Sequence, residues 1–110
     1  MFELDQYKVV FQYADGIRVT IPPVYDPLNV QIRSGVYAHI LQDLGKETKD
    51  GKKDWQYLFT GLAILHPNDQ PVKNDGRKKA FTRALNHSGF DRETRTRFWN
   101  AYWKARGKID

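Results

Sequence analysis

Residues 74–106 read NDGRKKAFTRALNHSGFDRETRTRFWNAYWKAR, and this stretch specifies the C-terminal part of the fold. Its apolar and aromatic residues recur every three or four positions, which is the spacing of side chains on one face of a helix. We predict one helix over about 74–86 and a second over 92–106, with a break at His87-Ser88-Gly89. Asp91 is a good N-cap for the second helix.

Positive charge is concentrated in the same part of the chain. Residues 71–110 carry 11 Lys/Arg against 4 Asp/Glu, whereas residues 1–70 carry 7 basic and 9 acidic side chains. The net charge of +5 therefore arises wholly in the last 40 residues. Aromatic residues interleaved with charge of one sign indicate a folded surface for an anionic partner, either nucleic acid or an acidic protein surface.

Length and composition limit the class of protein. The 110 residues fit a single small basic domain over 1–110, and 40% hydrophobic residues are too many for a disordered chain. The absence of cysteine excludes disulfides and thiolate metal sites. The first residues lack the pattern of a signal peptide, and no apolar run reaches the roughly 20 residues of a membrane span. We expect a cytoplasmic protein that does not interact with membranes.

The first third of the chain has strand character. Tyr7–Tyr13 reads as a strand, and Asp15-Gly16 is a strong signal for a two-residue hairpin turn. Ile17–Ile21 then alternates as the return strand, which Pro22-Pro23 ends because proline cannot donate to the ladder. The following segment, 24–33, fits either a short strand or the start of a helix.

The middle of the chain predicts a helix and then a strand. Ser34 can cap a helix whose apolar residues from Val36 to Leu44 follow helical spacing, with Gly45 as its stop. Residues 46–54 form a charged loop, and Trp55–Leu65 returns to strand character, with Gly61 as a possible bulge.

The expected fold class is therefore α+β. We predict a short antiparallel sheet of three or four strands packed with about three helices, the last two forming an αα-hairpin across Asn86 to Phe90. The expected core residues are Trp55, Phe59, Leu62, Phe81, Leu85, Phe98, Trp99 and Tyr102.

Both C-terminal helices begin with cations, which oppose the helix dipole. An anion would relieve this conflict, because free backbone N–H groups and basic side chains both favour it. Trp103 falls at the edge of its apolar face and is a candidate for an exposed contact. The alternative is a solvated face that only confers solubility. The candidate binding residues are Arg77, Lys78, Lys79, Arg83, Arg92, Arg97, Trp103 and Lys104.

His66 and Asp69 lie in a proline-flanked turn and invite a catalytic or metal-binding interpretation. Their spacing matches no metal-site template, and the same residues suit ordinary turn chemistry. The sequence contains no phosphate-binding loop, dinucleotide fingerprint or nucleophile elbow. We therefore expect no metal, no cofactor and no catalytic residues, with a small metal-dependent hydrolase or nuclease as the least favoured alternative.

The C-terminal half resembles a group of small uncharacterised bacteriophage proteins. The resemblance rests on FTGLA (59–63), HPND (66–69), GRKKA (76–80), RAL (83–85) and GFDRETR (89–95), followed by Trp99 and Tyr102. It implies a phage or prophage gene acting in a bacterial cytoplasm. The chain departs from the pattern at Gln70–Asn74, where related sequences carry Phe and Arg.

Two functions follow from these observations as hypotheses. The first is a non-enzymatic phage accessory protein that binds nucleic acid or a nucleoprotein complex through its basic C-terminal helices. The alternative is a protein–protein inhibitor of a host defence or nucleic-acid-processing enzyme, an anti-defence factor whose contacts would centre on Arg97 and Trp103.

Overall fold

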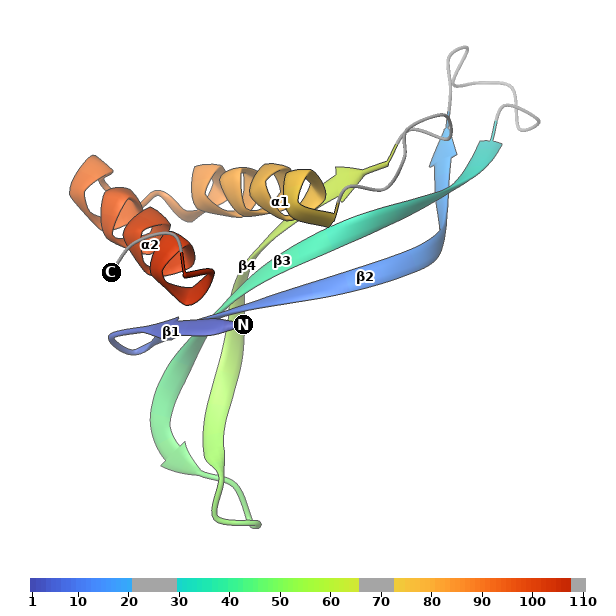
Figure 1. The fold of residues 1–110 in the computed structure, drawn as a ribbon. Helices are drawn as coiled ribbons and strands as arrows, with labels where there is room; N and C mark the ends of the chain where they lie inside the picture. The colour runs from blue at the N-terminus through green and yellow to red at the C-terminus, as the bar shows by residue number, and fades with distance from the viewer. Residues whose placement is uncertain (21–29, 66–72, 108–110) are drawn as a thin grey trace.

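The chain forms an antiparallel sheet followed by two helices that cover one of its faces (Figure 1). The computed structural model describes residues 1–20, 30–65 and 73–107. The sheet has four strands in the order β1-β2-β3-β4, and the fold is α+β as predicted. The elements are β1 (Phe2–Leu4), β2 (Tyr7–Thr20), β3 (Val30–Glu47), β4 (Lys53–Ile64), α1 (Lys73–Ser88) and α2 (Arg92–Ala105).

The predicted hairpin turn at Asp15-Gly16 is wrong, because β2 continues through it as one strand. A type I′ turn needs positive φ at both central residues, but only Gly16 has it, with φ of 76°. The result is a shift of the β2–β3 register between Ala14 and Ile17. The tight turn lies earlier, at Asp5-Gln6 between β1 and β2, where Asp5 has φ of 52°. Pro22-Pro23 and most of segment 24–33 lie outside the described residues.

The helix predicted after Ser34 is also wrong, because this segment is the middle of β3. Val36, Ala38 and Ile40 alternate toward the helices, while Tyr37, His39 and Leu41 lie on the opposite face. Apolar residues on both faces of a strand produce spacings of three and four that imitate a helix. Valine, isoleucine and tyrosine favour the strand once its neighbours are in place. The described residues therefore contain two helices, not the expected three.

The remaining elements agree with the sequence. Strand β4 spans Lys53–Ile64, and the charged loop before it closes on a turn in which Thr48 N donates to Lys52 O at 2.7 Å. Helix α2 begins after Asp91, whose Oδ1 accepts from Thr94 N at 2.8 Å. Residues 89–91 join the two helices, and α2 is inclined to α1 (Figure 1).

Gly61 is not a bulge but the place where α1 lies against β4. A Cβ added at Gly61 would lie 2.0 Å from Ala80 O and 2.3 Å from Ala84 N. Both atoms belong to the α1 backbone, so only a residue without a side chain permits this approach. Ala80 and Ala84 are themselves fully buried, and Ala38 pairs with Gly61 across the sheet. The contact between helix and sheet is thus built from the smallest residues.

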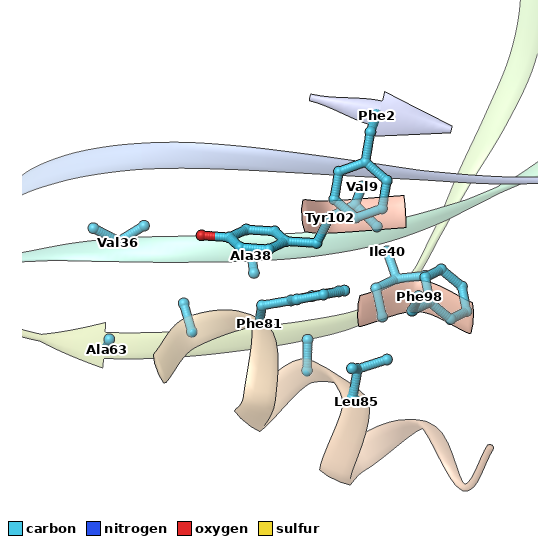
Figure 2. Packing of buried hydrophobic residues seen from close by; sticks show 12 residues of the cluster. Phe2, Val9, Val36, Ala38, Ile40, Ala63, Phe81, Leu85, Phe98 and Tyr102 are labelled. Carbon is cyan, nitrogen blue, oxygen red and sulfur yellow. The ribbon is translucent and has the colours of Figure 1, made fainter. Parts of the chain in front are cut away.

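Aromatic side chains fill the space around this contact (Figure 2). Phe81 of α1 lies 5.7 Å from Phe2 of β1, 4.7 Å from Trp99 and 5.6 Å from Tyr102 of α2, measured between ring centroids. Edge-to-face and offset pairs at these distances are favourable for aromatic rings. One side chain thereby joins the first strand to both helices.

The predicted core is confirmed for the helices and wrong for two residues of β4. Phe81, Leu85, Phe98 and Tyr102 are buried, and Phe59 and Trp99 pack against them. Trp55 and Leu62 lie on the other face of the sheet. Leu62 alternates with Gly61 and Ala63, whereas Trp55 is moved to that face by a register shift between Tyr57 and Phe59, which leaves Leu58 as an extra residue on β4. No helix in the described part of the chain is long and apolar enough to cross a membrane.

We expect Gly61→Ala to destabilise the protein by at least about 2 kcal/mol, because the added methyl group would push α1 off the sheet. Urea unfolding followed by circular dichroism measures this change. The control is Gln56→Ala, an exposed position of the same strand, with an expected change within about 0.5 kcal/mol. An unchanged midpoint for Gly61→Ala would contradict the described packing of α1.

Candidate functional site

A groove of about 260 Å³ runs between the outer surfaces of α1 and α2. Helix α1 contributes small polar and apolar side chains to it, and α2 contributes two arginines and an indole. Among the described residues, no carboxylate lines this groove, which gives it two positive charges that its own walls do not neutralise. The lining residues are Thr82, Leu85, Asn86, Arg92, Arg95, Thr96 and Trp99.

The two arginines differ in their surroundings. Arg92 is exposed at the first turn of α2, whereas Arg95 is half-buried one turn later. Within the described part of the chain, Arg95 Nε is buried and makes no hydrogen bond. A buried donor without a partner is costly. An oxyanion in the groove would meet the parts of the Arg95 guanidinium that line it, and would be stabilised by its charge.

Two tryptophans continue the groove along α2. The Trp99 and Trp103 rings lie 6.4 Å apart with planes 29° from parallel. Lys78 of α1 places its Nζ 5.0 Å from the centre of the Trp103 ring, a cation–π arrangement. Cations therefore stand at both ends of an indole pair. We call this set the helical seam: Lys78, Arg92, Arg95, Trp99 and Trp103.

The N-terminus of α2 is filled by its own cap. Asp91 Oδ1 accepts from Thr94 N, and Arg95 N donates to Asp91 O at 3.0 Å. Hydrogen bonds from the side chain and backbone of Thr94 lower the pKa of Asp91, and the charge of Arg95 adds to this. The carboxylate is thus ionised at neutral pH and occupies the position expected for an external anion. An anion on α2 would instead contact the arginine side chains of the groove.

The structure separates the predicted binding residues of α2 into two sides. Arg92 and Trp103 belong to the helical seam, while Arg97 and Lys104 line a shallow hollow with Leu4 of β1. Arg97 Nη2 lies 2.8 Å from Asp5 Oδ2, in the turn between β1 and β2. This half-exposed ion pair ties the turn to α2 and partly neutralises Arg97.

The predicted residues of α1 are also dispersed. Lys78 joins the helical seam, and Lys79 is exposed on the outer side of the helix. The guanidinium of Arg77 lies 5.6 Å from the centre of the Phe11 ring, at the sheet. Arg83 Nη1 donates to Leu62 O at 2.5 Å on the outer edge of β4. Arg83 thus covers a free carbonyl of an edge strand, which discourages pairing with another chain.

His87 extends this cover on β4, because its Nδ1 lies 3.2 Å from Thr60 O. The catalytic or metal-binding interpretation of His66 and Asp69 lies outside the described residues. Within the described ranges, no group of three or more His, Cys, Asp or Glu side chains is placed to hold a metal ion.

Sequence reasoning missed a second surface, the face of the sheet opposite the helices. Cross-strand pairing aligns Lys8 with Leu41 and Tyr57, and aligns Val10 with His39 and Thr60. We call this surface the open sheet face and define it by seven residues. They are Lys8, Gln12, Tyr37, His39, Trp55, Tyr57 and Thr60. Because the segment around His39 was predicted to be helical, no periodicity could reveal this alignment.

Contacts on the open sheet face centre on His39. Its Nδ1 lies 2.9 Å from Thr60 Oγ1, and its Nε2 lies 3.1 Å from Gln12 Oε1. The Tyr37 ring is nearly parallel to it at 5.6 Å, and Tyr57 meets it edge-on at 5.2 Å. Partial burial lowers the pKa of His39, so this imidazole is neutral at neutral pH and acts as a third flat ring.

Comparison of the chain with protein-family models, with curated proteins and with solved structures found no match in any of the three. The case for a function therefore rests on the two surfaces themselves.

We expect Arg83→Gln to lower the free energy of unfolding by about 1 kcal/mol, because it removes a hydrogen bond that holds α1 to β4. Lys79→Gln is the matched control on the same helix, since Lys79 is exposed and a change within about 0.5 kcal/mol is expected. Chemical unfolding monitored by tryptophan fluorescence compares the two. Equal loss in both variants would mean that Arg83 has no special role at the edge of β4.

Proposed function

We propose that the protein is a non-enzymatic accessory protein that binds nucleic acid, alone or in a nucleoprotein complex, through the helical seam. The observation that carries this proposal is the groove, where Arg92 and Arg95 face the same space without a carboxylate in its described lining. Guanidinium groups donate in a planar fork that fits phosphate oxygens.

The adjoining part of the helical seam supports the same partner class. Trp99 and Trp103 are half-buried, with Lys78 above the second ring. An indole beside cations is a surface on which a sugar or base packs while its phosphate meets a guanidinium. Arg97 and Lys104, on the other side of α2, would contribute a long-range positive potential rather than direct contacts.

Binding measured at several salt concentrations tests which side of α2 contributes more to nucleic-acid affinity. We expect Arg92→Gln combined with Arg95→Gln to weaken binding of a labelled 20-nucleotide DNA about tenfold or more. The slope of log affinity against log salt should fall by about 0.7–0.9 for each phosphate contact removed. Fluorescence anisotropy at salt concentrations from about 50 to about 300 mM measures both the affinity and its dependence on salt.

The matched control is Arg97→Gln combined with Lys104→Gln, which removes the same charge from the opposite side of α2. This double variant should bind within about threefold of the wild type, because only the general potential is reduced. Thermal unfolding of each variant verifies that the fold is retained. Equal weakening by the two double variants, or binding that ignores salt, would overturn the assignment to the helical seam.

The same surface would also serve an inhibitor that covers an acidic host protein. A pull-down from a bacterial lysate, with and without nuclease, separates the two functions. Retention of nucleic acid that nuclease removes supports the proposal. A single protein that remains bound after nuclease, with no oligonucleotide binding by the purified chain, would favour the anti-defence inhibitor instead.

A further inference from the structure

The open sheet face carries an inference of its own. In the described part of the chain the helices cover one side of the sheet (Figure 1), and on the other side Tyr37 and His39 are half-exposed and Tyr57 is exposed. Tyr57 is 65% exposed and stands on the edge strand β4, at the end of a three-strand row with Lys8 and Leu41. A large exposed aromatic side chain next to the ring of His39 leaves apolar surface in water, and a partner that covers it would recover hydrophobic free energy.

We propose that the open sheet face binds unpaired bases of a single-stranded nucleic acid, with Tyr57 as its principal stacking residue. Tyr57, His39 and Tyr37 form a row of rings along β4 and β3, with neighbouring rings 5.2 and 5.6 Å apart. Bases stack on such rings without regard to sequence. A four-stranded sheet with aromatic residues on its open face is a common solution to this recognition problem.

Polar groups within the row favour a base over a purely apolar partner. Gln12 and Thr60 flank His39 and hold its imidazole between them. Among the described residues, Gln12 uses its Oε1 on His39, which leaves its amide N–H groups and the phenol of Tyr57 to hydrogen-bond the edges of a base. A hydrophobic protein segment would leave these groups without partners, at a cost in binding free energy.

Charge complementarity at one end of the row identifies the partner as an anion. A shallow hollow of about 520 Å³ there includes Lys8, Lys52 and Lys53 but only one carboxylate among its described lining, that of Glu3. Lys8 Nζ lies 4.5 Å from the centre of the Trp55 ring, and Lys53 Nζ lies 5.8 Å from it. Lys53 is also 4.0 Å from Asp43, which leaves Lys8 and Lys52 as the main phosphate contacts. The phosphates of a bound strand would thus contact Lys8 and Lys52, while a neighbouring base stacks on an aromatic ring of the row.

This inference shares with the proposed function only the chemical class of the partner. Its residues lie on the side of the sheet away from α1 and α2, so variants of the two surfaces do not share contacts. It also adds a selectivity that the helical seam does not supply, because bases in a duplex are paired and stacked and cannot reach the rings.

The test compares Tyr57→Ala, Tyr57→Phe and Tyr13→Ala in anisotropy titrations with a labelled 20-nucleotide oligo-dT and with a duplex of equal length. Tyr13 is the matched control, since it is 48% exposed but pairs with Val36, on the face that carries the helices. We expect Tyr57→Ala to weaken oligo-dT binding about fivefold or more, and to leave duplex binding within about twofold. Tyr57→Phe keeps the ring, and both it and Tyr13→Ala should stay within about twofold of the wild type.

Three outcomes would overturn the inference. The first is unchanged oligo-dT affinity in Tyr57→Ala, and the second is equal weakening of oligo-dT and duplex binding. The third is a dimer of the wild type, seen by light scattering, that Tyr57→Ala dissociates, because a second copy would then occupy the open sheet face. Loss of oligo-dT binding in Tyr57→Ala but not in the Arg92/Arg95 double variant would support this inference while the proposed function failed.

Discussion

The direct contact of α1 with the β4 backbone at Gly61 is the constraint on which the rest of the structure depends. Because Ala80 and Ala84 meet a residue without a side chain, the helix lies closer to the sheet than larger residues would allow. This approach brings Phe81 within reach of rings from β1 and α2. Helix α2 then packs on this aromatic cluster, and the groove between the two helices follows from its position.

In the described part of the chain, the two layers present two outer surfaces, the helical seam and the open sheet face. On the helical side, charge is concentrated because the core takes most of the aromatic residues of α1 and α2 and leaves the cations outside. On the open sheet face the aromatic rings are themselves at the surface, and the lysines lie at one end of the row of rings. The two proposals therefore assign phosphate contacts to the helical seam and base contacts to the open sheet face of one chain of 110 residues.

The helical part of the fold could be predicted from the sequence, and the middle of the sheet could not. Asp91 and the spacing of Phe98 and Tyr102 are local signals, and they specify α2 correctly. Strand β3 depends on its neighbours, since its apolar residues serve two faces and imitate a helix. The candidate binding residues show the same difference between local signals and long-range contacts. The position of Arg92 in the first turn of a predicted helix pointed to this residue. The contacts of Arg83 with β4 and of Arg97 with Asp5 join distant parts of the chain, and no local pattern predicts them.

The most direct measurement of the central claim uses the three tryptophan indole N–H signals in a nitrogen-correlated NMR spectrum. Trp99 and Trp103 report on the helical seam, and Trp55 reports on the open sheet face. Titration with duplex DNA should shift the Trp99 and Trp103 signals and leave Trp55 in place, whereas oligo-dT should shift all three. Unchanged Trp99 and Trp103 signals at saturating nucleic acid would contradict the account of the helical seam.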